Sequence, residues 1–302
     1  MKTGITILLL FLIIVNDSFS QSWKRNRKEI IYSLGATNFL GELGGRDRVA
    51  SPFVIDLEPT MTRPAAGFSY RYTLTPYTKV RGSVTWGILK GNDQLTSEQF
   101  RNNRNLHFRS HIVEISGIYE FYFNEEQSGH RYNIKGARGM RAKNVTYYSF
   151  AGLGAFYFNP QAVHNGAWVS LQPLGTEGQG LPGGKVKYSR INVAIPMGLG
   201  ARYSIDRYWK IGIEIGYRKT FTDYIDDVST DYYDNAVLRA EKGEAAAALA
   251  DPNLGNFPYQ YDENGHTRHG LQRGDPKHKD AYIFGMINLN YTIQKRSSRA
   301  KF

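Results

Sequence analysis

The feature that most constrains the fold is a period-two alternation of apolar with small or charged residues, repeated eight times along the chain. In one such run, Ile211, Ile213 and Ile215 alternate with Gly212 and Glu214. Strict alternation places the two sets on opposite faces of a β-strand. The polar set consists of Gly, Ser, Glu and Arg, whereas the apolar set is broad and is rimmed by Tyr, Trp and Phe. This pattern is typical of a strand that faces lipid on one side and a closed lumen on the other.

The alternation predicts where the strands lie. The runs are residues 29–37, 65–75, 78–90, 106–123, 145–159, 188–204, 208–220 and 281–293. Several are longer than the roughly ten residues that cross a bilayer at a tilt, so we expect them to project beyond it. The sequence therefore predicts an all-β fold, an eight-stranded antiparallel up-and-down transmembrane β-barrel with long extracellular loops. We assign residues 21–302 to this single barrel domain.

The first 20 residues have the pattern of a secretory signal peptide. Lys2 supplies the positive charge, residues 5–15 form the apolar segment, and Ser18 and Ser20 form a small-x-small cleavage site. The alternative is an N-terminal membrane anchor, but a spanning helix needs about 20 apolar residues and this segment is shorter. We expect cleavage after residue 20 and delivery to the outer membrane of a Gram-negative bacterium.

Charge and cysteine content limit the partners. The chain has no cysteine, which excludes disulfides, thiolate metal sites and a lipid-modified N-terminal cysteine. Its net charge is +11, from 38 Lys and Arg against 27 Asp and Glu. Basic proteins often bind nucleic acid, but a protein exported from the cytoplasm is expected to meet outer-membrane lipid, phosphate-rich lipopolysaccharide or an acidic protein instead. We predict no nucleic-acid partner.

The predicted connections differ at the two ends of the barrel. Short turns at Pro76 and Asp206 are expected in the periplasm, and the long connections outside. Within those loops, the Gly-rich residues 175–184 are expected to be mobile and residues 239–249 to form one short surface helix. The exception is the connection 124–144, which is long although it belongs to the periplasmic side. It is either a solvated loop or a docking surface built from Arg131, Lys135, Arg138, Arg141 and Lys143.

Alternation assigns a set of charged residues to the inside of the barrel. The set is Arg71, Arg81, Glu114, Glu120, Arg190, Arg202, Glu214 and Arg218. The interior of an eight-stranded barrel is just wide enough for side chains to fill it. Because an unpaired charge in a closed lumen is very unfavourable, we expect these residues to form an ion-pair network that plugs the barrel.

The chain offers no constellation for catalysis, a cofactor or a metal. His107 and His111 share the outward face of their strand, where they are expected at headgroup level. His266, His269 and His278 have no specific metal-ligand spacing, and no cysteine supports them. The protein is therefore predicted not to be an enzyme.

One local signature follows directly on the outer end of a strand. Residues 222–229 contain Thr222, Asp223, Tyr224, Asp226 and Asp227, which place three carboxylates beside an aromatic cluster. Such a group can bind Ca²⁺, cap the barrel mouth by pairing with lumen arginines, or contact a partner. All three interpretations remain open at this point.

The motif also carries a resemblance to a known family. Residues 214–229 read Glu-x-Gly-x-Arg-x-x-x-Thr-Asp-Tyr-x-Asp-Asp-Val-Ser, and an Ile-Pro-x-Gly strand lies at residues 195–198. With the start at residues 29–39 and with Glu114 and Glu120, most of the mature chain resembles the outer-membrane β-barrel family that includes PorG of the type IX secretion system. The resemblance implies a non-enzymatic barrel that associates with a periplasmic ring, formed by a lipoprotein and its partner protein, and supports protein transport and in some members gliding motility.

Two functions follow as hypotheses. In the first, the protein is a barrel component of the type IX protein secretion machinery that anchors or stabilises the periplasmic ring. In the second, it is a small porin-like or structural outer-membrane barrel unrelated to secretion.

Overall fold

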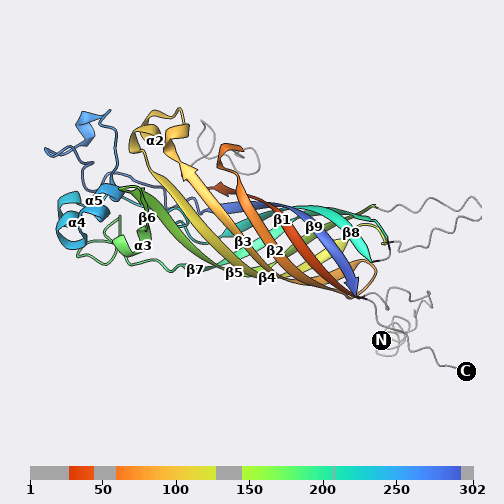
Figure 1. Cartoon of the computed structure of the whole chain (residues 1–302). Helices are drawn as coiled ribbons and strands as arrows, with labels where there is room; N and C mark the ends of the chain where they lie inside the picture. The colour runs from red at the N-terminus through yellow and green to blue at the C-terminus, as the bar shows by residue number, and fades with distance from the viewer. Residues whose placement is uncertain (1–26, 44–58, 127–144, 207, 294–302) are drawn as a thin grey trace, which may run out of the picture.

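Eight antiparallel strands close into a barrel, which confirms the predicted fold class (Figure 1). The structure is a computed structural model that describes residues 27–43, 59–126, 145–206 and 208–293. The barrel strands are β1 (Lys28–Leu40), β2 (Arg63–Thr73), β3 (Thr78–Asn92), β4 (His107–Tyr122), β5 (Val145–His164), β7 (Ile191–Ser204), β8 (Trp209–Thr220) and β9 (Ala281–Ile293). Each pairs with its neighbours in the chain, β1 pairs with β9, and β5 pairs with both β4 and β7. The wall is therefore continuous and has no free edge along its length.

The two ends of the barrel differ in their connections. At the end that we call inner, Lys28 pairs with Ile293, and short turns join β2 to β3 and β7 to β8. The connection 123–144 leaves from the same end, because Tyr122 pairs with Tyr148. The other, outer end carries the remaining four connections, β1–β2, β3–β4, β5–β7 and β8–β9. The arrangement is that of an outer-membrane-type barrel.

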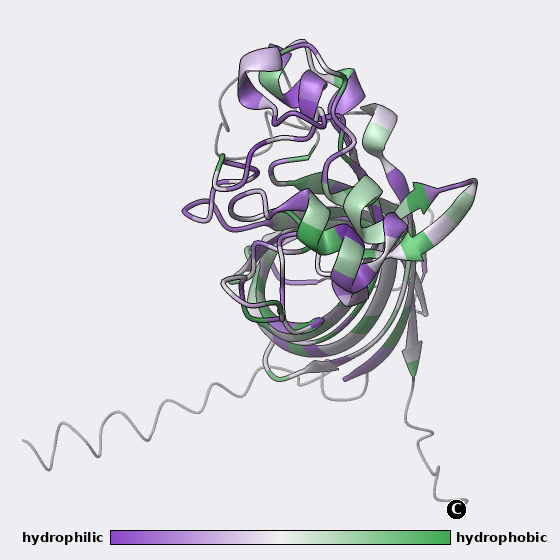
Figure 2. Ribbon diagram, turned by 90° about the vertical axis from the view of Figure 1, so that its left-hand side faces the viewer, coloured by the Kyte–Doolittle hydropathy of each residue, from purple (hydrophilic) through white to green (hydrophobic). Residues whose placement is uncertain are grey.

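Short elements gather at the outer end (Figures 1 and 2). They are η3 (Pro59–Met61), η4 (Asp93–Leu95), α2 (Gln99–Arg104), β6 (Ala167–Ser170), α3 (Leu171–Leu174), α4 (Asn235–Lys242), α5 (Glu244–Ala250) and η5 (Pro258–Gln260). The single surface helix expected at residues 239–249 is wrong. Gly243, with φ of +90°, separates α4 from α5, and Leu238 and Ala246 pack together in a small buried cluster. No helix in the described parts of the chain is long and apolar enough to cross a membrane.

Apolar side chains lie on the outer face of the strands and polar side chains on the inner face, as the alternation predicts. On β8, Ile213 is 61% exposed, whereas the neighbouring Glu214 is 5% exposed. The same alternation runs around the wall as bands of hydrophobic and hydrophilic residues (Figure 2). An apolar exterior around a polar interior is stable only where the exterior meets lipid.

Pro196 interrupts the ladder locally, because proline has no backbone N–H to donate. Pairing of β5 with β7 stops between Ala151–Met197 and Gly154–Ala194 and then resumes in the same register. The defect is therefore a break in hydrogen bonding and not a bulge, because a bulge would shift the register by one residue.

Candidate functional site

The inner half of the lumen holds a cluster of charges around two carboxylates. Glu29 of β1 contacts Arg202 at 2.9 Å and Lys210 at 2.6 Å. Glu126, which follows β4, contacts Lys79 at 2.9 Å and also pairs with Arg202 and Lys210. Glu126 thereby folds back from the end of β4 into the barrel.

A second cluster spans the middle of the lumen. Arg71 lies between Glu29 at 3.0 Å and Glu120 at 2.7 Å. Arg81 contacts Glu120 at 2.9 Å and forms two parallel bonds with Glu214, at 2.8 and 2.9 Å. This two-pronged geometry gives the strongest and most directional kind of ion pair. Carboxylates and guanidinium groups thus alternate along the barrel axis.

A third pair lies further out. The Nε atom of Arg218 is 3.4 Å from Glu114, which also accepts a hydrogen bond of 2.9 Å from the hydroxyl of Tyr282. The guanidinium group of Arg218 lies over the ring of Phe284, 4.6 Å from its centroid. Arg218 therefore connects the charged part of the lumen with an aromatic layer further out.

The structure brings together all but one of the predicted lumen residues. The exception is Arg190, which precedes β7 and is half-buried, with its Nη1 donating to Asn159 at 3.2 Å. It lies apart from the ion pairs because the alternating segment begins only at Ile191. Four further residues belong to the network and were not predicted: Glu29, Lys79, Glu126 and Lys210. Three of these four lie on strands in the inward phase, so alternation extended to the strand ends would have found them.

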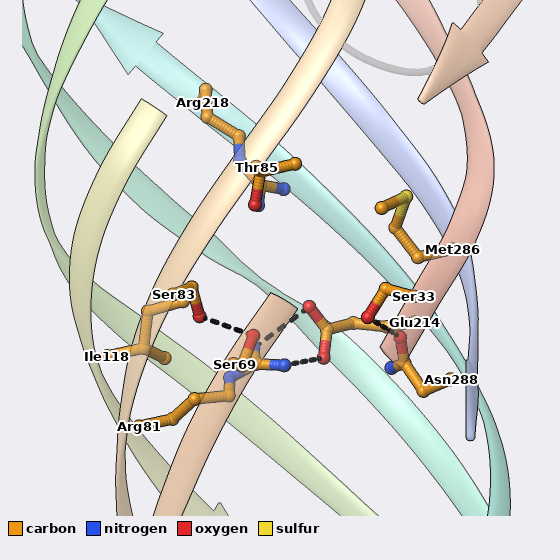
Figure 3. A pocket seen from close by; sticks show the side chains of 10 residues that line it. All are labelled: Ser33, Ser69, Arg81, Ser83, Thr85, Ile118, Glu214, Arg218, Met286 and Asn288. Carbon is orange, nitrogen blue, oxygen red and sulfur yellow. Dashed lines mark hydrogen bonds and ion pairs between the residues drawn. The ribbon is translucent and has the colours of Figure 1, made fainter. Parts of the chain in front are cut away.

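The charges leave almost no open space. In the part of the chain that the structure describes, the network contains six cationic and five carboxylate side chains. A cavity of about 20 Å³ lies between Arg81, Glu214 and Arg218 (Figure 3). That volume holds about one water molecule. Side chains therefore fill the lumen at this level.

Glycines in β7 make room for aromatic rings inside the barrel. A Cβ atom on Gly200 would lie 2.2 Å from the ring of Tyr148, and one on Gly198 would lie 2.6 Å from the ring of Phe150. Tyr148 uses the space to donate a hydrogen bond of 3.0 Å to Glu214. These glycines serve packing within a strand.

The outer half of the lumen is apolar, which the sequence did not predict. A cluster of buried residues fills it, among them Phe39, Phe108, Phe156, Phe158, Tyr282 and Phe284. Their rings contact edge to face, as in the Phe39–Phe108 pair with centroids 4.9 Å apart. We call these six residues the aromatic plug. A layer of aromatic rings therefore lies on the outer side of the ion-pair network.

The motif 222–229 closes the mouth by inserting apolar side chains into the plug. Ile225 and Val228 are 0% and 1% exposed and belong to the same buried cluster. Asp226 accepts hydrogen bonds from the amides of Val228 at 3.0 Å and Leu43 at 3.3 Å. Of the three interpretations, capping of the barrel mouth fits this geometry. The motif caps the mouth through apolar contacts and loop hydrogen bonds, and not through the expected ion pairs with lumen arginines.

Asp227 ties the motif to the loop between β6 and β7. It accepts hydrogen bonds from the hydroxyls of Thr176, at 2.5 Å, and Tyr188, at 2.6 Å. Arg273 donates to the Asp227 carbonyl at 2.7 Å and pairs with Glu177 at 3.0 Å. Burial raises the pKa of Asp227 to about 6, although the Arg273 charge and the two hydroxyls oppose the rise. The Gly-rich loop expected to be mobile is thus packed against the motif.

A second group of carboxylates lies where the first and last connections meet. Asp223 bonds to the hydroxyl of Ser229 at 2.7 Å, and Asp280 accepts from the amide of Ile225 at 2.8 Å. Burial raises the pKa of Glu42 to about 7 and that of Asp280 well above its usual range. Thr222 also belongs here, because its carbonyl accepts from the amide of Asp280 at 3.0 Å. Tyr224 stacks on Tyr188 with centroids 4.5 Å apart.

Across the described ranges, no group of three or more His, Asp or Glu side chains is placed to hold a metal ion. The signal peptide and the proposed docking residues Arg131, Lys135, Arg138, Arg141 and Lys143 lie outside the described residues.

A family model matches the chain over residues 5–244, and its description is a domain of unknown function, DUF6089. The chain belongs to the DUF6089 family. None of the curated proteins matches the sequence.

Small barrels are among the similar solved structures. Neisserial surface protein A is 8% identical, with 88% of this chain and 97% of that chain covered and a TM-score of 0.39. Ail of Yersinia pestis, solved with the heparin analogue sucrose octasulfate, is 10% identical, with 88% and 99% covered and a TM-score of 0.37. The N-terminal β-barrel domain of Pseudomonas aeruginosa OprF is 9% identical, with 88% and 98% covered and a TM-score of 0.33.

Proposed function

We propose that this DUF6089 protein is a non-enzymatic component of the type IX protein secretion machinery that anchors or stabilises a periplasmic ring assembly at the outer membrane. The observation that carries the proposal is the filled lumen. The ion pairs of Arg71, Arg81 and Glu214 and the aromatic plug block the interior. A barrel without a passage acts through its surfaces.

The periplasmic end offers a surface whose base is fixed to the barrel. Asn124, at the start of the basic connection 124–144, donates to the Val145 carbonyl at 2.9 Å and accepts from the amide of Tyr147 at 3.1 Å. Glu126 is bound inside the lumen by Lys79 and Arg202. Both ends of the connection are therefore fixed, which favours a role of its basic residues in docking.

The resemblance of residues 214–229 to the secretion-linked barrel family supports the same proposal. In this chain the motif seals the outer mouth, because Ile225 and Val228 enter the aromatic plug. A sealed mouth suits a protein that assists export without forming the export channel. The ring lipoprotein and its partner protein are the proposed contacts.

Charge reversal of Arg138, Arg141 and Lys143 to Glu tests the docking proposal. The expected result is that the variant barrel loses most of the ring proteins in affinity co-purification, since like charges then face an acidic partner. The control reverses Arg239, Lys242 and Lys277, which lie in the outer loops, and is expected to retain the ring. Equal recovery of the ring by both variants, with both barrels folded, contradicts the proposal.

The second hypothesis, a porin-like barrel, requires a conducting lumen. Single-channel recording of the purified barrel in a planar bilayer tests it separately. Structural or surface roles unrelated to secretion are tested by the secreted-protein profile of a deletion strain.

A further inference from the structure

A row of basic side chains lies on the outward face of the barrel near its outer end. Lys90 of β3 and Arg109 of β4 are direct cross-strand partners. Both point away from the lumen, because their strand neighbours Leu89 and Phe108 are fully buried inside. Lys90 and Arg109 therefore present two positive charges side by side to the surroundings of the barrel.

Arg190 approaches the same place from the other side of β5. Its Nη1 donates to Asn159 at 3.2 Å, whereas an Nη atom of Arg109 donates to Gln161 at 3.1 Å. Asn159 and Gln161 are two residues apart on the same face of β5, which corresponds to about 7 Å. The three cations, Lys90, Arg109 and Arg190, thus converge on one patch that we call the basic row.

The basic row lacks an anionic partner within the described ranges. None of its three cations takes part in an ion pair there, and the Nε atom of Arg109 is buried without a hydrogen-bond partner. Like charges directly opposite one another on neighbouring strands are destabilising. The arrangement is therefore complementary to an anion that lies between the cations.

The position of the basic row along the barrel axis indicates which part of the membrane surrounds it. Toward the inner end, the same outward faces become apolar or aromatic: they carry Ile88 and Trp86 on β3, Val113 beyond His111 on β4, and Tyr157 beyond Asn159 on β5. Trp86 stacks on His111, and the guanidinium group of Arg190 lies 5.7 Å from the centre of the Tyr157 ring. Aromatic residues mark the membrane interface. The basic row stands directly beyond them, at the level of lipid headgroups in the outer leaflet.

Arg109 is held in position for binding. Its guanidinium carbon lies 3.9 Å from the centre of the Trp168 ring, which belongs to the β5–β6 hairpin that extends the wall beyond β7. Together with Gln161, Trp168 fixes the plane of the guanidinium group. A preorganised fork of this kind matches the oxygens of a phosphate, and Lys90 adds a point charge beside it.

We propose that Lys90, Arg109 and Arg190 form a binding site for the phosphate of a phosphorylated glycolipid in the outer leaflet, of the lipopolysaccharide class. The acyl chains would run along the apolar faces of β3 and β4 below the row, past Ile88 and Val113. The proposal requires the barrel to span the outer membrane, but it is independent of any role in secretion.

The test uses the folded full-length barrel in detergent and lipid A as the probe. Native mass spectrometry measures the bound lipid for the wild type and for a variant with Lys90→Gln, Arg109→Gln and Arg190→Gln. We expect binding to weaken by at least about tenfold, because three charge-assisted contacts are lost. The control variant, Lys28→Gln with Lys219→Gln, removes two outward-facing lysines elsewhere on the wall and should bind as the wild type does.

Removal of the phosphates from lipid A should reduce wild-type binding to the level of the triple variant. Inorganic phosphate at the concentration of the lipid should not displace lipid A, because the acyl chains add contacts that free phosphate lacks. Unchanged lipid A binding by the triple variant overturns the proposal. So does equal binding of dephosphorylated lipid A, or displacement by inorganic phosphate at that concentration.

A single substitution separates binding from folding. Lys90→Glu places a carboxylate opposite Arg109 and so replaces a repulsive pair with an attractive one. In lipid-free detergent the variant barrel should resist heating at least as well as the wild type, while its lipid A binding falls. A variant that is as stable as the wild type and binds lipid A fully contradicts the proposal.

Discussion

Arg81 and Glu214 join opposite walls of the barrel. Arg81 belongs to β3 and Glu214 to β8, which are separated by β2, β1 and β9, and two parallel bonds of 2.8 and 2.9 Å connect them across the lumen. Glu120 and Tyr148 extend this link to β4 and β5. One ion pair thus connects strands that share no backbone hydrogen bonds, which makes the network a brace across the barrel.

Removing one partner of this pair should destabilise the barrel strongly. Arg81→Met leaves the Glu214 carboxylate without its main partner, and a buried unpaired charge typically costs about 3–5 kcal/mol. The double variant with Glu214→Met removes both charges and should lose clearly less stability than the sum of the single variants. Urea unfolding in detergent, followed by gel migration without boiling, measures this. Arg239→Met, in an exposed ion pair with Glu244, is the control and should change stability little.

The wild-type barrel should not conduct ions in a planar bilayer. The ion-pair network fills the lumen around a cavity of about 20 Å³, and the aromatic plug lies beyond it. Single-channel recording with purified barrel checks this. Regular open-channel steps from the wild type would favour the porin-like hypothesis instead.

Shortening one plug residue of the motif should loosen the loops without opening the barrel. Ile225 is fully buried, and an Ile→Ala change in a core typically costs about 2–5 kcal/mol. The loss should appear locally, as faster hydrogen exchange in residues 221–280, while the β-strands keep their protection. Val237→Ala, at an exposed position of α4, is the matched control and should leave exchange unchanged. Equal exchange in both variants contradicts the assigned role of Ile225.

The segment that caps the outer mouth, residues 222–230, should be more stable in mild acid than at neutral pH. Burial raises the pKa of Asp227 to about 6, above the value that a carboxyl group has in an unfolded chain. A group that binds its proton more tightly when folded contributes stability that is full below about pH 4 and is lost as pH rises through about 6. Amides of residues 222–230, corrected for intrinsic rates, should therefore exchange more slowly at pH 5 than at pH 8.

Asp227→Asn should reduce this pH dependence, because one titrating group is gone while its hydrogen-bond partners Thr176 and Tyr188 remain. A residual slope remains, because burial also raises the pKa of Glu42 to about 7, that of Asp223 to about 6 and that of Asp280 well above its usual range. A cap whose corrected exchange in wild type is equal at the two pH values contradicts this prediction.

The sequence was sufficient to predict the strands because each lipid-facing residue alternates with a lumen-facing one. That rule places Arg81, Glu120 and Glu214 inside the barrel, and the structure has them there. Lys79 and Lys210 were not predicted to face the lumen. Each is the second residue of its strand, so only one residue of the strand precedes it to establish the alternation.

The aromatic plug could not be predicted from alternation. Alternation places Phe108 and Phe156 in the inward phase, but the rule expects polar residues there and so gives no reason to predict an apolar layer inside the barrel. The cap depends on contacts between loops far apart in the sequence, such as Asp226 with Leu43, which no local pattern specifies. The same holds for the break between α4 and α5, where Gly243 is the only local sign.

The most direct test of the proposed function is the secreted-protein profile of a strain that lacks this gene. If the barrel anchors the type IX secretion machinery, a broad set of secreted proteins should disappear from the medium and accumulate in the periplasm. The wild-type gene should restore the profile, and the Arg138, Arg141 and Lys143 charge-reversal variant should not. An unchanged profile in the deletion strain would contradict the secretion role and leave the protein as a barrel with a structural or surface task.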